Sequence, residues 1–356
     1  MSVLSPGDVS AAIARAKPGD RIKLLPGVYP ETLVADRAIT IVSEIPGEAI
    51  FSPPGEACGV HLSADATLIG LTVEGDGVKR NGVEVTAGDP LLRDFKCVGT
   101  TAALMVESGA RLRLETSHIS RNGFGAMIKS GGEIFGTGCV FEDNRLFTVL
   151  VERQARALFE DSQFLSTHLG GLVLNEQGYG EFARCVWRNS PTAQRENRPF
   201  HAQLMLLPGA VARLSQDCRV MSGGGAGVHS NQGQLFLYDA EIGENTDAGV
   251  QLDQRSVADI QRCRIVRNGG AGVIVKEDSR LNALLLDASE NGAGGLVLLG
   301  PAAAEVNQGR LANNLVGAVV TQGARLKIAD CDVSGNRDGS IRSDGTGVAE
   351  ALRLKE

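Results

Sequence analysis

The chain has 356 residues and a formal net charge of −7 at pH 7, with no extended basic segment. Nucleic acid and an anionic membrane surface are therefore poor partners on electrostatic grounds. The first residues lack the charged and apolar regions of a secretory signal, and no apolar run approaches the length of a membrane span. We expect a cytoplasmic protein, unless a leaderless route exports it.

Residues 1–19 are expected to cap the end of the fold. Apolar residues at positions 9, 12, 13 and 16 would share one face of a short helix, and Ser5 or Asp8 could cap its N-terminus. Such a helix would cover the apolar interior that the first strands leave open.

From residue 67 onward the sequence repeats with a period of 21 to 24 residues, broken once, which is typical of a solenoid. The blocks begin at Thr67, Pro90, Arg111, Glu133, Arg156, Tyr179, Val211, Gln234, Val257, Arg280, Ala303 and Arg325. Each holds short runs with period-2 apolar alternation, separated by Asn and Gly, which predict strands and turns. Ankyrin, tetratricopeptide, HEAT and leucine-rich repeats have other periods or consensus residues.

The repeat predicts an all-β fold, a right-handed parallel β-helix of about 12–14 coils with three strands in each coil. A single domain would span residues 1–356, because a solenoid lengthens without a thicker core. A loop would be inserted at 190–202, and residues 347–356 would form the C-terminal cap.

The stretch "GDRIKLLPGVYPETLVADRAITIVSE" (19–44) resembles the opening coil of the pectin-lyase-like right-handed parallel β-helix superfamily, with a strand, a Pro-Gly-x-Tyr turn and a second strand. The resemblance extends as architecture from about Pro6 to the C-terminus. It implies the fold but no one function, since that superfamily holds pectate lyases, polygalacturonases, epimerases and binding proteins that catalyse nothing.

Two residue types recur in columns that run from coil to coil. We interpret the cysteines as small buried hydrophobes rather than metal or redox thiols, because no Cys-x-x-Cys pair is present. We expect the asparagines to bond the backbone across coils at turns that favour the αL conformation. The columns are Cys97, Cys139, Cys185, Cys218, Cys263 and Cys331, and Asn122, Asn144, Asn189, Asn245, Asn268, Asn291, Asn313 and Asn336.

The strand that reads Gly-Val-x-Val is expected to carry an apolar ridge on its outer face, at the position x. A smooth floor of glycines would lie beside it, so a protein partner or a second copy of the chain could approach closely. Ordinary strand propensity is the alternative explanation. The expected ridge consists of Met105, Met127, Leu150, Val173, Met205, Ile274, Val297, Val319 and Ile341.

The resemblance implies that polysaccharide-cleaving relatives carry their chemistry on this same outer face. Polygalacturonases have Asn-Thr-Asp, Asp-Asp and Gly-His-Gly motifs there, and alginate epimerases have Asp-Pro-His-Asp. At the matching places this sequence holds "RNG" (80–82), "TAA" (101–103), "DAG" (247–249) and "GAG" (270–272), so no carboxylate pair carries over. The epimerase motif is absent, "DPLLRD" (89–94) being the nearest stretch and lacking the histidine. Paired carboxylates suited to glycosidic bond cleavage are not visible either.

Two polar islands interrupt the expected ridge. The first joins His201, His229, Gln251 and Asp253, with His168 and the inserted loop beside them, and could be a small sugar-binding or acid/base site. A solvated loop at a solenoid edge is the plainer alternative. The second joins His61 and Glu84, which we interpret as cross-strand pairing. We expect no metal site and no cofactor.

Two functions remain open on the sequence alone. The missing acid pairs, the missing secretion signal and the apolar ridge favour a non-catalytic scaffold that binds a protein or self-associates. The alternative is a carbohydrate-binding protein or a carbohydrate-active enzyme of the lyase, hydrolase or epimerase type, with a non-standard site. The weak candidates for its catalytic residues are His201, His229, Asp253 and His168.

Overall fold

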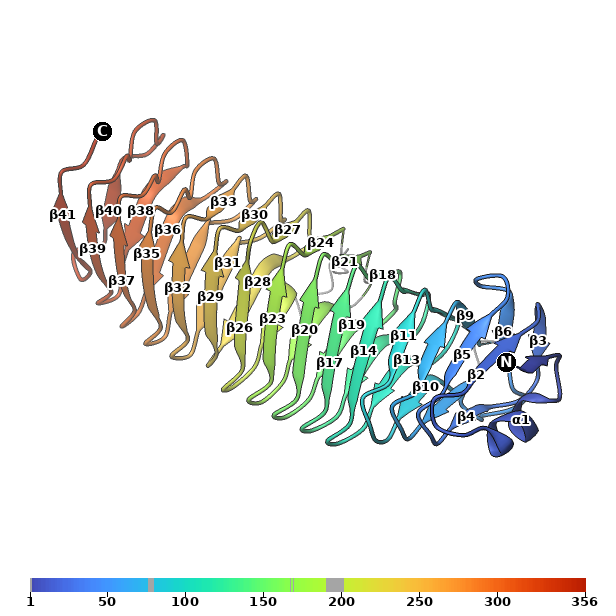
Figure 1. Cartoon of the computed structure of the whole chain (residues 1–356). Helices are drawn as coiled ribbons and strands as arrows, with labels where there is room; N and C mark the ends of the chain where they lie inside the picture. The colour runs from blue at the N-terminus through green and yellow to red at the C-terminus, as the bar shows by residue number, and fades with distance from the viewer. Residues whose placement is uncertain (1, 76–79, 167, 169, 190–201) are drawn as a thin grey trace. The chain divides into compact units, whose positions relative to one another are not determined.

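A computed structural model describes residues 2–75, 80–166, 168, 170–189 and 202–356. The chain divides into two compact units, Met1–His168 and Leu169–Glu356. Both have the predicted fold, a right-handed parallel β-helix whose strands form sheets that we name A, B and C (Figure 1). The coils after β33 (Arg264–Val266) contribute strands to sheets A and C and only isolated bridges in place of the expected third strand. In the described part of the chain, no helix is long and apolar enough to cross a membrane.

The first unit has six coils that contribute a described strand to sheet C. Sheet A holds β1 (Ser2–Leu4), β2 (Arg21–Leu24), β5 (Thr40–Ser43), β8 (Thr67–Ile69), β11 (Leu91–Arg93), β14 (Arg111–Glu115), β17 (Glu133–Thr137) and β20 (Arg156–Glu160). Sheet B holds β3 (Gly27–Tyr29), β6 (Ala49–Phe51), β9 (Leu71–Glu74), β12 (Lys96–Val98), β15 (His118–Ser120), β18 (Val140–Glu142) and β21 (Gln163–Leu165). Sheet C holds β4 (Leu33–Ala35), β7 (Val60–Leu62), β10 (Asn81–Val85), β13 (Ala102–Val106), β16 (Phe124–Ile128) and β19 (Phe147–Val151).

The second unit has eight coils that contribute a described strand to sheet C. Sheet A holds β23 (Tyr179–Ala183), β26 (Val211–Ser215), β29 (Gln234–Tyr238), β32 (Val257–Gln261), β35 (Arg280–Leu284), β37 (Ala303–Asn307), β39 (Arg325–Ala329) and β41 (Val348–Leu352). Sheet B holds β24 (Val186–Arg188), β27 (Arg219–Met221), β30 (Glu241–Gly243) and β33 (Arg264–Val266). Sheet C holds β22 (Gly170–Leu174), β25 (Ala202–Leu206), β28 (Ala226–Asn231), β31 (Val250–Asp253), β34 (Val273–Lys276), β36 (Gly294–Leu299), β38 (Val316–Val320) and β40 (Ile341–Ser343).

The expected N-terminal helix is present as α1 (Val9–Arg15), with Asp8 at its N-cap position. Its buried residues are Val9, Ala12 and Ile13, and it packs against β4. The strand β1 before it was not expected from the sequence, and it pairs in parallel with β2. Residues 348–352, inside the expected C-terminal cap, form β41, which pairs with β39.

In the second unit each coil bends at fixed positions where the backbone adopts a positive φ. One such residue follows the sheet A strand, as at Asp239, Arg262 and Leu285, and a second follows the sheet B strand where there is one, as at Glu244 and Arg267. Single non-glycine residues reach this αL region at an energetic cost, so the surrounding coils must impose it. The bends bring consecutive strands onto three faces around one apolar interior.

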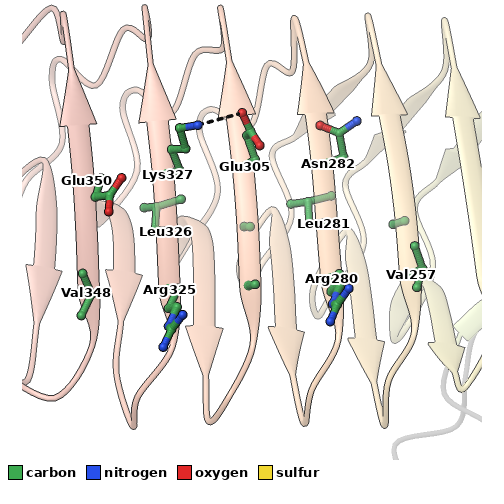
Figure 2. A pocket seen from close by; sticks show the side chains of 13 residues that line it. Val257, Arg280, Leu281, Asn282, Glu305, Arg325, Leu326, Lys327, Val348 and Glu350 are labelled. Atoms are coloured by element: carbon green, nitrogen blue, oxygen red, sulfur yellow. Dashed lines mark ion pairs between the residues drawn. The ribbon is translucent and has the colours of Figure 1, made fainter.

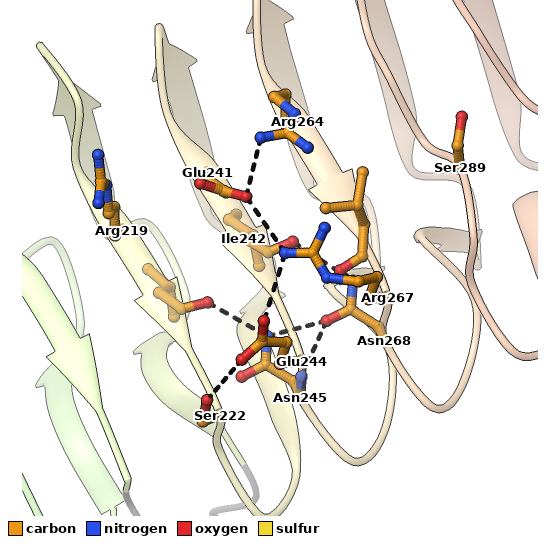
Figure 3. A network of polar contacts seen from close by, with 12 residues as sticks. Arg219, Ser222, Glu241, Ile242, Glu244, Asn245, Arg264, Arg267, Asn268 and Ser289 are labelled. Atoms are coloured by element: carbon orange, nitrogen blue, oxygen red, sulfur yellow. Dashed lines mark hydrogen bonds and ion pairs between the residues drawn. The ribbon is translucent and has the colours of Figure 1, made fainter.

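A ladder of buried asparagine side chains links neighbouring coils directly after the second bend. In the second unit, the Asn268 Oδ1 atom accepts hydrogen bonds from the Asn245 backbone N–H (3.2 Å) and from Asn245 Nδ2 (2.9 Å) (Figure 3). Asn268 Nδ2 in turn donates to Asn291 Oδ1 at 3.0 Å. The exposed ion pairs of Arg267 beside the ladder, drawn in the same view, contribute far less to stability.

The ladder corrects two of the expected asparagine positions. In the coil of residues 313–314 the ladder member is Asn314, whose backbone N–H donates to Asn336 Oδ1 at 2.9 Å. Asn313 instead has a φ of +58° and holds the preceding αL position, as does Asn189 with a φ of +56°. Asparagine suits both the ladder position and the αL position before it, so the sequence pattern does not distinguish the two.

The glycine of the Gly-Val-x-Val strand makes room for this ladder. A Cβ atom at Gly272 would lie 2.8 Å from Asn291 Nδ2, and one at Gly249 would lie 2.8 Å from Asn268 Nδ2. The expectation of a smooth outer floor of glycines is therefore wrong, because the missing side chains would point toward buried asparagine amides and the neighbouring backbone.

The cysteines are free and, apart from the half-buried Cys58, buried, which fits a packing role. Burial raises the pKa of the Cys139 thiol to about 11 and that of the Cys97 thiol to about 12. The proposed single column is not exact. Cys97 pairs in register with Ile119. Val140 pairs with His118, so Cys139 stands opposite Ser117, and Cys97 therefore lies two positions further along the coil than Cys139.

The alternation of inner and outer residues gives a test of the fold. Val273 is fully buried, while its neighbour Ile274 is half-exposed on the outer face. We expect Val273→Asp to cost more than about 4 kcal/mol, because it places an unpaired charge in the apolar interior. Ile274→Asp should cost about 1 kcal/mol. Urea unfolding followed by circular dichroism measures both, and equal losses would contradict the assignment of inside and outside.

Candidate functional site

Three neighbouring strands of the second unit bring polar side chains together on the outer face of sheet C. His229 on β28 pairs in register with Gln251 on β31. Asp253 lies two residues after Gln251 on the same face, and Lys276 ends the next strand, β34. The parallel register of the coils therefore gathers four polar groups that are distant in the sequence.

The four side chains form a connected network around one carboxylate. His229 Nε2 lies 3.0 Å from Asp253 Oδ2, and Gln251 Nε2 donates to that same oxygen at 2.7 Å. Lys276 Nζ lies 3.5 Å from Asp253 Oδ1. The side chains of His229 and Asp253 are both 14% exposed, so the network is sheltered from water but reachable from the outside.

Burial acts to raise the pKa of Asp253, but the hydrogen bonds from His229 and Gln251 and the charge of Lys276 outweigh it and hold the pKa below its usual value. Asp253 is therefore a carboxylate at neutral pH. Because it contacts Nε2 of His229, it fixes the orientation of the imidazole ring, as carboxylates do in many acid/base sites.

The arrangement can bind hydroxyl and carboxylate groups and can move a proton. The other ring nitrogen of His229 can donate or accept a hydrogen bond, and Gln251 and Lys276 supply N–H donors. Asp253 is the single carboxylate of this described network, so the paired-carboxylate chemistry of glycosidic hydrolysis is not what these residues offer. A histidine base with a cation beside it suits proton abstraction instead.

The structure brings together some of the expected site residues but not all. His229, Gln251 and Asp253 meet as predicted, and Lys276 is a fourth member that the sequence pattern did not indicate. His168 belongs to the first unit and is exposed. His201 and residues 190–201 of the inserted loop lie outside the described residues.

The expected apolar ridge is present in two short columns. In the first unit Met105, Met127 and Leu150 pair in register and are half-exposed. In the second unit the same holds for Ile274, Val297 and Val319.

Three members of the ridge are corrected by the structure. Val173 and Met205 pair with each other, but each is only 2% exposed, since an outward position on a solenoid can still be covered. Ile341 pairs with the inward Ala318, and Arg342 takes the position opposite Val319. The last coil is shifted by one residue relative to the repeat pattern, which moves its side chains to the other face.

Sheet A of the second unit carries a groove that the sequence reasoning missed, with a volume of about 660 Å³ (Figure 2). Its floor contains Ala303, which pairs in register with Arg280 on one side and Arg325 on the other. Neither guanidinium forms an ion pair with a described residue, whereas Lys327 nearby pairs with Glu305 at 3.6 Å. The signal in the sequence is the small residue Ala303 between Arg280 and Arg325 in one column of sheet A.

Comparison with known proteins agrees with the fold. A family model described as "Right handed beta helix region" matches residues 248–349. No match is found among curated protein sequences.

Three solved structures show the range of the structural similarity. The periplasmic alginate epimerase AlgG is 10% identical over 99% of this chain and 83% of that chain, with a TM-score of 0.50. Tailspike protein 3 of bacteriophage CBA120 is 10% identical over 98% and 58%, with a TM-score of 0.57. The A-module of the mannuronan C-5 epimerase AlgE6 from Azotobacter vinelandii is 12% identical over 98% and 93%, with a TM-score of 0.44. The similarity to AlgG and to tailspike protein 3 supports the architecture alone, and the chain is a right-handed parallel β-helix protein.

Proposed function

We propose that the protein binds an acidic polysaccharide on the outer face of sheet C in its second unit, through His229, Gln251, Asp253 and Lys276. The observation that carries this proposal is the 3.0 Å contact between His229 and Asp253, with Lys276 beside it. An oriented imidazole and an ammonium group on a sheltered face can together bind a sugar hydroxyl and a sugar carboxylate.

The comparisons support this function over the protein-binding scaffold that the sequence favoured. One of the structures with this fold is an alginate epimerase, and alginate is a polymer of uronic acids. The catalytic motif of such epimerases is absent here, so this chain would use its own residues. His229 would accept a proton from the carbon next to a bound uronate carboxylate, while Lys276 would offset the negative charge that develops there.

Titration with defined oligosaccharides tests the binding. We expect alginate or polygalacturonate oligosaccharides to bind more tightly than neutral dextran oligosaccharides in isothermal titration calorimetry. His229→Ala should weaken this binding roughly tenfold or more, because it removes a charge-assisted contact. Incubation of the same acidic oligosaccharides with the protein, followed by chromatography, would reveal any turnover, which His229→Ala should abolish.

The groove on sheet A provides the matched control for this titration. The double variant Arg280→Ala with Arg325→Ala lies on a different sheet and should leave oligosaccharide binding unchanged. If it abolishes binding while His229→Ala does not, the polysaccharide lies along the arginines and the proposed site is wrong. If wild-type protein binds none of the acidic oligosaccharides, the function itself is refuted.

The role of Asp253 predicts a pH-dependent stability. Since the folded protein lowers the pKa of this carboxyl, its stabilising contribution is present above the unfolded pKa of about 3.9 and is lost as the pH falls through the folded value. We expect Asp253→Asn to cost about 1–3 kcal/mol at pH 7 in urea unfolding, and the difference from wild type to narrow below about pH 4. Glu305→Gln on sheet A should change little at either pH. If the free energy of unfolding differs between Asp253→Asn and wild type by the same amount at pH 7 and pH 3, the lowered pKa of Asp253 in the folded protein is contradicted.

Binding of a protein partner or self-association is a second candidate function, and the two half-exposed apolar columns favour it. Replacing Met127, Leu150 and Val297 with Lys would break both columns. If the ridge mediates self-association, the mass in solution measured by light scattering should fall to that of one chain, whereas Arg280→Ala should leave it unchanged. This second function would be refuted if the wild-type protein is already monomeric and if wild type and triple variant capture the same proteins in a pull-down.

A further inference from the structure

A second histidine and carboxylate pair lies on sheet C of the first unit, and it has a cysteine beside it. Cys58 and Gly59 lead directly into β7, where His61 points outward. Glu84 on β10 pairs in register with His61. The Cys-x-x-His spacing places the thiol and the imidazole on one segment, and the parallel register supplies the carboxylate from the next coil.

The three ligand atoms are close enough to share one ion. One side-chain donor atom from each of Cys58, His61 and Glu84 lies within 4.8 Å of the other two, and the described residues contain no other such group of three. Around a tetrahedral zinc ion, bond lengths of about 2.0–2.3 Å place ligand atoms roughly 3.3–3.8 Å apart. Side-chain rotations that move the three ligand atoms closer together by about an ångström would therefore complete the site. His61 and Glu84 are each 33% exposed, so an ion can enter from solvent.

The neighbouring residues hold the side chains of His61 and Glu84 in the orientation that a metal ion requires. His61 Nδ1 faces Glu84 Oε2 at 4.0 Å, while His61 Nε2 lies 3.5 Å from the Thr86 hydroxyl. The other carboxylate oxygen, Glu84 Oε1, accepts a hydrogen bond from Asn81 Nδ2 at 2.9 Å. One nitrogen and one oxygen are thus occupied by outer partners, and the opposite atoms are left to face each other, as at metal centres.

The backbone around Cys58 is anchored on both sides. The Thr32 hydroxyl donates to the Cys58 carbonyl oxygen at 2.7 Å. A Cβ atom at Gly59 would lie 2.4 Å from Val73 Cγ1 and 2.9 Å from the Gly82 carbonyl oxygen, so this segment packs directly against the following coil. The close approach at Gly59 fixes the distance between the cysteine segment and the strand of Glu84.

A nucleophilic Cys-His-Glu triad is the main alternative, and the position of the carboxylate speaks against it. In such a triad the imidazole lies next to the thiol and draws its proton away. Here Glu84 also offers a carboxylate oxygen within 4.8 Å of the Cys58 sulfur. A thiol next to a carboxylate stays protonated and is a poor nucleophile.

We propose that Cys58, His61 and Glu84 bind a zinc-class divalent ion, with Asn81 and Thr86 as positioning residues. A sulfur, a nitrogen and an oxygen ligand suit Zn²⁺, while Ca²⁺ and Mg²⁺ require oxygen ligands throughout. On binding, the S–H bond of Cys58 breaks, its proton passes to solvent, and the sulfur lone pair forms the bond to the metal. Three protein ligands leave the fourth tetrahedral position to water or to a ligand oxygen.

Metal titration of the full chain tests the site. We expect the wild-type protein to bind one Zn²⁺ ion per chain in competition with a chromogenic chelator. Co²⁺ used as a probe should give a tetrahedral visible spectrum with a thiolate-to-cobalt charge-transfer band. Cys58→Ser should abolish that band, and His61→Ala and Glu84→Gln should each remove tight binding. Asn81→Ala should weaken Zn²⁺ binding roughly 10- to 100-fold while it keeps the charge-transfer band, because it alters only the outer support.

Two controls separate loss of the site from loss of the fold. His118 and Glu142 form another histidine and carboxylate pair in the same unit, with His118 Nε2 3.3 Å from Glu142 Oε2. This pair belongs to no group of three potential metal ligands among the described residues, so His118→Ala should leave Zn²⁺ binding unchanged. Circular dichroism of each variant without metal should match the wild type. Wild-type protein that binds no Zn²⁺, or that binds it as tightly after Cys58→Ser in a folded variant, overturns the proposal.

Discussion

The hydrogen-bonded register between neighbouring coils is the constraint on which the rest of the structure depends. Parallel strands in register stack each residue directly against its counterpart one coil away, so a side chain that suits one coil must also suit its neighbours. The asparagine ladder is the strictest case. Asn245, Asn268 and Asn291 each accept from one coil and donate to the next, and a glycine in the preceding coil leaves space for each amide. An apolar replacement in the ladder would leave buried donors without partners.

This constraint explains why the fold could be read from the sequence. A period of 21 to 24 residues with recurring Asn, Gly and Val predicts stacked coils, because only a stacked architecture reuses the same positions so often. The N-terminal helix followed from the spacing of the apolar residues at positions 9, 12, 13 and 16, with Ser5 or Asp8 as its possible cap. The strand β1 was missed since a three-residue strand before the first repeat has no periodicity to reveal it.

The site was only partly predictable for a related reason. Register gave the neighbours His229 and Gln251, and the two-residue step gave Asp253. Cys58 was missed, because it lies in the segment before a strand, where the repeat pattern does not say which way a side chain points. Burial was missed at Met205, since exposure depends on what covers a face rather than on the alternation of residues. The Ile341 assignment failed because the final coil is one residue out of step with the repeat.

Within each unit, the polar residues of the outer sheet C column occur as pairs in adjacent coils, His61 with Glu84 and His229 with Gln251 and Asp253. Both groups contain a histidine near a carboxylate, and one further member of each group decides the chemistry. Beside Asp253 that member is Lys276, whose ammonium already supplies a positive charge and would repel a divalent cation. Beside Glu84 it is Cys58, a neutral thiol that a zinc ion can convert into a ligand. The histidine therefore takes the same strand position in both units, while the group proposed to bind an acidic sugar has an ammonium beside its carboxylate and the group proposed to bind a metal ion has a thiol.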